Sequence, residues 1–322
     1  MQQKLIIIAI VLAVIVLAAA TFTGFYLSNQ NQSSQSTQMN ESTATEPLQS
    51  KVIPVVAAEN FWGSLISQLG GTRTQVLSIV TDPNADPHEY ESNSQDAQAI
   101  ANAAFVIVNG AGYDDWATKL IDASNTPHQV VLNVAELLGK KEGDNPHFWY
   151  SPYYVNDTVK AMYNGLVSID PADTAYFTQQ YTALNASLGV YNARISEIRA
   201  QFAGKKVAST ESIFVYLANA TGLDVVSPPT FMDAVAEGND PPAQSIVQFQ
   251  QLLENGTVTI LVYNAQTVTP LTQSIKALAA SKGIPIVAVT ETIQPPDVPF
   301  QVWMNAELIT LQNALNAQAL GQ

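Results

Sequence analysis

The chain of 322 residues contains no cysteine, few charged side chains and only three histidines. Without cysteine it can form no disulfide, zinc–thiolate site, thiol nucleophile or lipid-modified cysteine. Charged residues make up 12% of the chain, about half of the usual ~25%. The chain has 13 basic and 27 acidic residues, which gives a net charge of −14. This charge argues against nucleic-acid binding, because that needs a basic surface. The negative charge suits a protein whose ligand is a cation.

A long apolar run opens the chain, and Lys4 is the only charge before it. At about 1.5 Å per residue the run is long enough to cross a bilayer. We therefore predict that residues 1–27 form a membrane anchor or, alternatively, a signal cleaved near Ala18–Ala20. With Lys4 inside the cell, the rest of the chain lies on the extracellular side. Residues 28–50, rich in Gln, Asn, Ser and Thr, are typical of a disordered stalk.

From residue 51 onward, short apolar runs alternate with helical patterns, which is typical of parallel sheets covered by helices. We expect an α/β fold of two similar lobes, residues 51–169 and 204–322, joined by one long rigid helix over residues 170–203. The binding site then lies in the cleft between the lobes. The predicted strands cover residues 51–57, 75–80, 105–109, 129–133, 206–209, 258–263 and 285–290. The predicted helices outside the linker cover residues 59–69, 94–103, 114–123, 212–220, 269–281 and 301–320.

The linking helix is marked by one apolar stripe. Apolar side chains recur at steps of four and three residues from Phe177 to Phe202, along one face of a helix of about 30 residues. Gly204 ends it. The same stripe could serve a coiled-coil dimer, but the α/β pattern on both sides favours a helix packed along both lobes of a monomer.

Two of the three histidines follow a proline, in Pro87-His88 and Pro146-His147. Histidine is the commonest metal ligand among side chains, and a preceding proline stiffens the backbone that presents the ring. In open α/β sheets, ligands bind beyond the carboxyl ends of the strands. His88 and His147 follow predicted strands of the first lobe, and Glu211 and Glu291 follow predicted strands of the second. If the lobes face each other, these four side chains converge.

Two imidazoles and two carboxylates suit a divalent first-row metal ion. Catalytic zinc sites keep an open coordination position, whereas four protein ligands indicate a protein that holds a metal rather than an enzyme. The carboxylate pair favours Mn²⁺ or Fe²⁺, although Zn²⁺ binds most such sites more tightly than Mn²⁺. Because both histidines must be neutral to bind, we expect the affinity to fall as the pH drops through about 6.5.

At these residues the chain resembles the metal-binding class of ATP-binding-cassette solute-binding proteins, the group that delivers manganese and zinc to membrane permeases. The resemblance covers nearly all of residues 51–322. Four segments carry it: Asp86-Pro87-His88-Glu89-Tyr90-Glu91, Asn145-Pro146-His147-Phe148-Trp149, Ser209 to Tyr216, and Gly283 to Thr292. Three positions depart from the family's pattern: Asn145 stands where Asp is more usual, Glu211 where zinc-type members tend to have His, and Glu291 in place of the usual Asp.

The resemblance implies that His88, His147, Glu211 and Glu291 are direct ligands of a metal carried as cargo, Mn²⁺ or Zn²⁺ with Fe²⁺ as a further candidate. It also implies delivery to an ABC-type permease, and a rigid inter-lobe helix. The lipidation cysteine and the His/Asp-rich loop of many zinc members are absent, and the N-terminal anchor would replace the lipid.

Three other functions fit parts of the pattern. A binding protein for a metal chelate, such as a siderophore or cobalamin, would need a cleft lined by aromatics or arginines. A metallohydrolase would use both histidines and one glutamate as ligands and the other glutamate as a base. An adhesin would hold a purely structural metal. Other notable residues have structural interpretations: His128 begins a strand, and Tyr113, Trp116 and the Gly110/Gly112 pair predict a turn and core.

Overall fold

The computed structural model describes residues 52–84 and 87–320, with the side chains of 319 and 320 excepted. These residues belong to one compact unit. The predicted anchor (1–27), the predicted stalk (28–50) and Asp86 lie outside the described residues. Within the described ranges, every helix is too short or too polar to cross a membrane.

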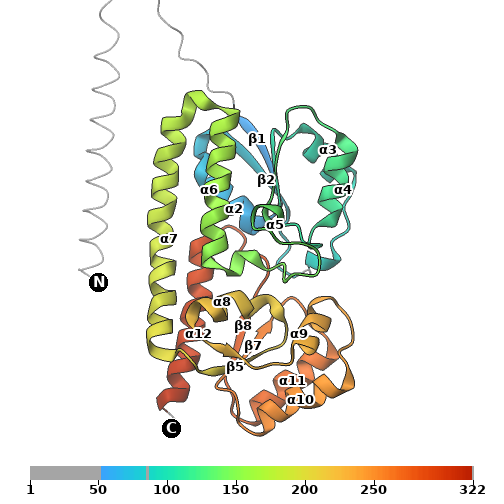
Figure 1. Ribbon diagram of the computed structural model, residues 1–322, viewed down its shortest axis with the longest axis vertical. Coiled ribbons are helices and arrows are strands. Elements are labelled where there is room, and N and C mark those ends of the chain that lie inside the picture. Colours follow the sequence, from blue (N-terminus) through green and yellow to red (C-terminus); the bar gives the residue numbers. More distant parts are fainter. Residues whose placement is uncertain (1–51, 85–86, 321–322) are drawn as a thin grey trace, which may run out of the picture. The chain divides into compact units, whose positions relative to one another are not determined.

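The first lobe is built on a four-stranded parallel sheet with the strand order β2-β1-β3-β4 (Figure 1). Its strands are β1 (Ile53–Glu59), β2 (Thr74–Val80), β3 (Phe105–Val108) and β4 (Val130–Asn133). Its helices are α2 (Asn60–Gly70), α3 (Ser94–Asn102), α4 (Asp115–Ser124), α5 (Val134–Leu137) and α6 (Pro152–Ile169). Strand β3 is buried along its whole length, as expected of a central strand covered on both faces.

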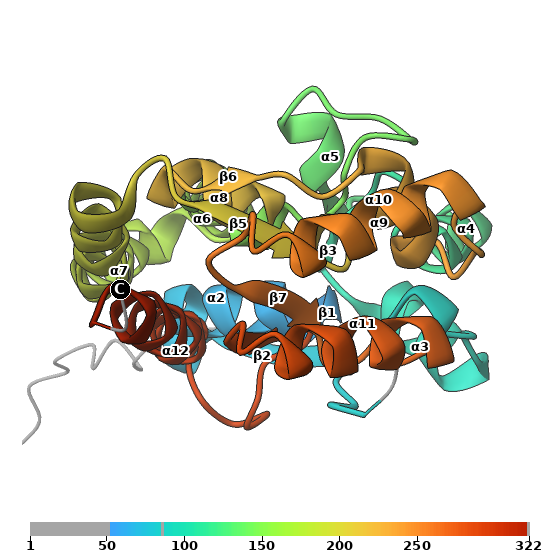
Figure 2. The ribbon, with the colours of Figure 1, turned by 90° about the horizontal axis from the view of Figure 1, so that it is seen from below.

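The second lobe repeats this plan with the strand order β6-β5-β7-β8, again all parallel. Its strands are β5 (Lys206–Ser209), β6 (Asp224–Val225), β7 (Leu261–Asn264) and β8 (Ile286–Val289). Its helices are α8 (Val215–Thr221), α9 (Pro229–Ala236), α10 (Ala243–Glu254), α11 (Pro270–Ser281) and α12 (Phe300–Leu320). Helices α8 and α9 lie on one side of the strands and α11 and α12 on the other (Figure 2).

The α/β class with two parallel sheets is confirmed. Short 3-10 helices stand at several loop positions: η1 (Gly71–Arg73), η2 (Pro87–Glu89), η3 (Phe148–Tyr150), η4 (Pro171–Asp173) and η5 (Ser212–Phe214). The sequence prediction lacks helices α5, α6, α9 and α10 and the short strand β6. It also placed the strand predicted at 258–263 three residues too early, because β7 begins at Leu261.

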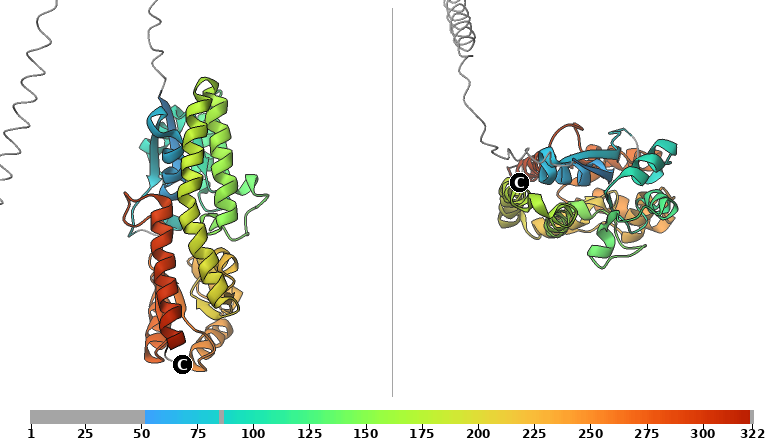
Figure 3. Two further views of the ribbon diagram at one scale, coloured as in Figure 1. Left: turned by 90° about the vertical axis from the view of Figure 1, so that its left-hand side faces the viewer. Right: turned by 90° about the horizontal axis from the view of Figure 1, so that it is seen from above.

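Helix α7 (Thr174–Phe202) is the predicted long helix, with 29 residues. It contacts α2 and α6 of the first lobe and α8 and α12 of the second, and so runs along both (Figures 1 and 3). The predicted stripe from Phe177 to Phe202 is buried, except that Tyr181 is half-buried and stacks on Tyr163. The apolar face is thus covered from within the chain, as predicted.

One hydrophobic core extends through both lobes. Phe61 and Trp149 of the first lobe, Tyr191 of α7 and Phe300 of α12 belong to the same cluster. The start of α12 also reaches the first lobe, where the Phe300 N–H donates to Ser64 Oγ at 3.0 Å. The division into 51–169, 170–203 and 204–322 stays a prediction, and the shared core indicates that the lobes are closely coupled.

Candidate metal centre

Each predicted ligand stands in a loop on the carboxyl side of a strand, although helix α5 comes between β4 and His147. His88 lies in η2, after β2, and His147 directly precedes η3. Glu211 lies between β5 and η5, and Glu291 follows β8. The two sheets present these loops toward each other, so the site is built from both lobes.

The structure brings three of the four residues together. Ligand atoms of His88, His147 and Glu291 all lie within 4.8 Å of one another, the one such group in the described part of the chain. His88 Nε2 is 3.5 Å from Glu291 Oε2. Two ligand atoms about 2.1 Å from a tetrahedral metal ion are about 3.4 Å apart. This pair is therefore already spaced to share a metal ion.

Glu211 lies outside this group of three, although its side chain is fully buried. Its backbone carbonyl accepts a hydrogen bond from Ser209 Oγ at 2.7 Å. The next residue, Ser212, accepts at its carbonyl from Asn145 Nδ2 at 2.7 Å. The Glu211 turn is thus tied to the His147 loop, and its role as a ligand stays a prediction.

His147 is held as a neutral ring. Burial lowers its pKa well below the ordinary 6.5, and the neighbouring His88 lowers it further. Asn145 Oδ1, 2.7 Å from Nδ1, can only accept, which assigns the proton to Nδ1. Nε2 is buried and has no hydrogen-bond partner among the described residues. A buried, unprotonated nitrogen of this kind suits a metal ion, and protonation of His147 begins at a lower pH than the 6.5 expected from the sequence.

Glu291 is held by donors from both lobes. Its Oε2 accepts from Tyr113 Oη and its Oε1 from Asn264 Nδ2, both at 2.6 Å. Its backbone N–H donates to Gln266 Oε1 at 2.7 Å. The sequence analysis assigned Tyr113 to turn and core and did not single out Asn264 or Gln266. No local pattern marks these contacts, because Tyr113 and Glu291 are 178 positions apart.

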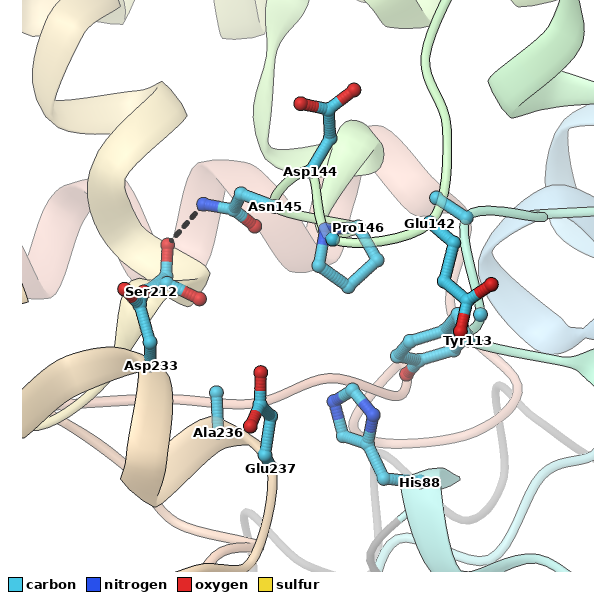
Figure 4. Close-up of a pocket in the computed structure, with 13 residues that line it drawn as sticks. His88, Tyr113, Glu142, Asp144, Asn145, Pro146, Ser212, Asp233, Ala236 and Glu237 are labelled. Atoms are coloured by element: carbon cyan, nitrogen blue, oxygen red, sulfur yellow. Dashed lines mark hydrogen bonds between the residues drawn. The ribbon is translucent and has the colours of Figure 1, made fainter. Parts of the chain in front are cut away.

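A cavity of about 300 Å³ adjoins the cluster and reaches it at His88 (Figure 4). Glu142 and Asp144 of the first lobe and Asp233 and Glu237 of the second line it. The side chain of His88 is 21% exposed, whereas His147 and Glu291 are fully buried. The cavity is thus an acidic approach that ends at the most accessible of the three side chains.

Fold and site together define a bilobal α/β protein in which three side chains that could hold a metal ion are gathered between two parallel sheets. The chain belongs to the family described as zinc-uptake complex component A, periplasmic (ZnuA), whose model matches residues 55–314.

Solved structures show the same fold. The crystal structure of ZnuA matches 82% of this chain and 99% of its own, with a TM-score of 0.67 at 20% identity. FpvC from Pseudomonas aeruginosa, in complex with Mn²⁺, matches 83% of this chain and 99% of its own, with a TM-score of 0.69 at 20% identity.

Curated relatives match in sequence. The manganese-binding lipoprotein MntA of Halalkalibacterium halodurans is 26% identical over 186 residues, 54% of this chain and 59% of its own length. The zinc-binding protein TroA of Treponema pallidum is 24% identical over 157 residues, 46% of this chain and 51% of its own. The chain thus spans little more than half the length of these relatives.

Proposed function

We propose that this protein captures a divalent transition-metal ion, Mn²⁺, Zn²⁺ or Fe²⁺, on the extracellular side of the membrane and delivers it to an ABC-type permease. The observation that carries the proposal is the cluster of His88, His147 and Glu291, in which a buried neutral imidazole turns an unprotonated nitrogen toward a carboxylate and a second imidazole. This donor set fits a divalent first-row ion.

The family and the relatives support this proposal. Relatives are named for binding manganese and zinc, and the similar protein MtsA of Streptococcus pyogenes is named an iron ABC transporter substrate-binding lipoprotein. These names cover the three metals that the donor set suits.

In the proposed complex, His88, His147 and Glu291 hold the ion, and Glu211 completes the set from the second lobe. Glu211 directly precedes Ser212, whose carbonyl accepts a hydrogen bond from the His147 loop, so its turn is tied to the site. The protein acts by binding rather than by catalysis. Glu291 already accepts hydrogen bonds at both oxygens, which suits a fixed ligand better than a general base.

The acidic cavity argues for a cationic cargo over an anionic chelate. The four carboxylates that line the approach to His88 would repel a siderophore that carries negative charge. The predicted anchor (1–27) and stalk (28–50) would keep this monomeric protein at the cell surface, close to its permease. The division into lobes 51–169 and 204–322 around the helix at 170–203 belongs to the same proposal.

Titration of the full chain with Zn²⁺, Mn²⁺ and Fe²⁺, followed by elemental analysis, tests the proposal. We expect one tightly bound equivalent, which is lost in His147→Asn. The matched control is His128→Asn, since His128 is exposed and its φ of 62° lies where Asn is tolerated. Metal at 100 times its Kd should also stabilise the protein by about 2.7 kcal/mol. A folded protein that binds no stoichiometric metal would refute the proposal.

A further inference from the structure

A hydrogen bond between Tyr113 and Glu291 links the two lobes at the candidate metal centre. Tyr113 Oη, from the loop after β3, donates to Glu291 Oε2, after β8, at 2.6 Å. The tyrosine is buried, with 4% of its surface exposed. No sequence motif connects Tyr113 with the site, and the capture function does not by itself require it.

The backbone that presents Tyr113 is unusual. Three successive residues before it, Gly110, Ala111 and Gly112, have φ values of 76°, 57° and 87°. This left-handed conformation strains a residue such as Ala111, because it brings Cβ close to the following carbonyl oxygen. The buried carboxylate of Asp114 fixes the loop by accepting the N–H groups of Asn109 and Gly110 at 2.6 and 2.7 Å. Strain kept in place by buried hydrogen bonds is a feature of functional sites.

The ring of Tyr113 is also confined by its neighbours. It meets the ring of His88 edge-on at 4.6 Å and that of Trp149 at 5.1 Å between centroids. Figure 4 shows Tyr113 beside His88 at the cavity. With the loop fixed and the ring enclosed, the position of the hydroxyl is set in advance.

The two oxygens of Glu291 are therefore distinguished. Oε2 lies 3.5 Å from His88 Nε2, whereas Oε1 is held by Asn264 Nδ2 at 2.6 Å. A carboxylate pinned at both ends cannot rotate to offer both oxygens equally to one ion. Oε2 is the oxygen that faces His88, and a carboxylate oxygen that accepts one hydrogen bond can still bind a metal ion.

We infer that Tyr113 is a positioning residue that restricts Glu291 to binding through Oε2 alone and so favours Zn²⁺ over Mn²⁺; the inference rests on the proposed metal capture. Four-coordinate geometry suits Zn²⁺, whereas Mn²⁺ takes up six oxygen-rich positions and gains from a bidentate carboxylate. Tyr113 also accommodates the extra methylene of glutamate at a position where the family usually has aspartate, because it anchors the end of the longer side chain.

Tyr113→Phe tests the inference, since it removes only the hydroxyl. The Zn²⁺ affinity should fall about 10–100-fold, the usual effect of losing a hydrogen-bond partner of a ligand. The Mn²⁺ affinity should fall less, because the released carboxylate can bind through both oxygens. The ratio of the two affinities therefore moves toward Mn²⁺, and the visible absorption of the Co²⁺-loaded variant weakens as its coordination number rises. Tyr163→Phe is the control, because Tyr163 bonds only to Thr178 on the surface of the described structure.

Unchanged affinities, or an equal loss for both metals with an unchanged Co²⁺ spectrum, would overturn the inference. X-ray absorption on the Zn²⁺-loaded and Mn²⁺-loaded wild type gives a second test that does not depend on the folding of a variant, and a bidentate Glu291 in the Zn²⁺ form would refute it. Failure of the wild type to bind Zn²⁺, Mn²⁺ or Co²⁺ would instead refute the proposed function. The two failures are thus distinguishable.

Discussion

Asn145 donates from its side-chain Nδ2 to the carbonyl oxygen of Ser212 at 2.7 Å, while its Oδ1 faces Nδ1 of His147 at the same distance. One amide therefore orients the candidate ligand His147 in the first lobe and holds the turn beside Glu211 in the second. The aspartate that is more usual at this position could orient the imidazole of His147. It could not hold the Ser212 carbonyl, because an ionised carboxylate has no proton to donate.

Asn145→Asp should separate these two roles. The carboxylate would face the Ser212 carbonyl without a donor between them, so the free energy of unfolding of the metal-free protein should fall by about 1–3 kcal/mol. The stabilisation on adding Zn²⁺ should grow, since a carboxylate on Nδ1 makes the imidazole a stronger ligand. Urea unfolding with and without Zn²⁺ measures both. Asn93→Asp is the control, because the Asn93 side chain accepts in its helix cap, a task that Asp performs equally well. Equal metal-free stability in Asn145→Asp and wild type would contradict the account.

Glu307 on α12 predicts a pH dependence of stability. Burial raises its pKa from 4.5 to about 7. Tyr150 Oη lies 2.7 Å from both Glu307 Oε2 and the Thr290 carbonyl, and its single proton cannot serve both acceptors. A protonated Glu307 resolves this by donating to Tyr150, which then donates to Thr290. Folding thus favours the protonated form of Glu307. The contribution of this group to the free energy of unfolding is fully present below pH 4.5 and is lost as the pH rises through 7.

Glu307→Gln should remove this loss, because the amide keeps the donor at every pH. Relative to wild type, the variant should gain up to about 3 kcal/mol between pH 5 and pH 8. Urea unfolding at the two pH values gives the difference. Glu254→Gln, on the exposed face of α10, should leave the pH dependence unchanged. A wild type and a Glu307→Gln variant that lose stability in parallel would show that Glu307 ionises normally.

Two helical glycines should respond oppositely to alanine. A methyl group at Gly165 in α6 would lie 2.6 Å from Cζ of the buried Phe105, whereas one at Gly189 in α7 would meet nothing within 4 Å. Gly165→Ala should destabilise by about 1–3 kcal/mol through overpacking. Gly189→Ala should stabilise by about 0.5–1 kcal/mol, because alanine is the better helix former. Thermal unfolding of the pair is the measurement, and a stabilising Gly165→Ala would mean that α6 and β3 are less closely packed than described.

The acidic cavity should raise the rate of metal association. Removing two charges with Glu142→Gln and Glu237→Gln should slow Mn²⁺ association about fivefold at low salt, and the effect should shrink at 0.15 M salt, where the screening length is about 8 Å. Trp149, whose ring is 5.3 Å from that of His147, offers a fluorescence signal for stopped-flow work. Asp157→Asn with Glu254→Gln removes two exposed charges elsewhere and serves as the matched control. An equal slowing in both double variants would rule out a local role for the cavity.

Much of the fold could be predicted because buried parallel strands have a strong local signal. β5 lies where it was expected, and β3 is an apolar run with no polar face. Helices α9 and α10 are hard to predict because the pairs Pro228-Pro229 and Pro241-Pro242, which are typical of loops, stand where these helices begin. In the structure Pro229 occupies the first turn of α9, where a missing N–H does no harm.

The candidate metal centre was predictable only in part. His88, His147 and Glu291 could be found because each lies in a loop on the carboxyl side of a strand, and the strand ends of a parallel sheet face one edge. The sequence could not tell that Glu211 stays outside the group of three, since that depends on side-chain direction within a packed interface. Nor could it reveal Tyr113, whose ring lies in the first lobe and whose hydroxyl meets a residue of the second.

Helix α7 restricts the ways in which the lobes can separate. Its apolar face is packed against α2 and α6 at one end and α8 and α12 at the other. Hinge opening of the lobes would therefore bend the helix or expose that face. Torsion about the helix axis, by contrast, would keep that face covered. Torsion moves the two halves of the metal centre sideways along arcs instead of pulling them apart. A cargo ion held between the lobes would therefore be loosened because its ligands from the two lobes slide past each other. A partner protein that binds both lobes could twist them in this way.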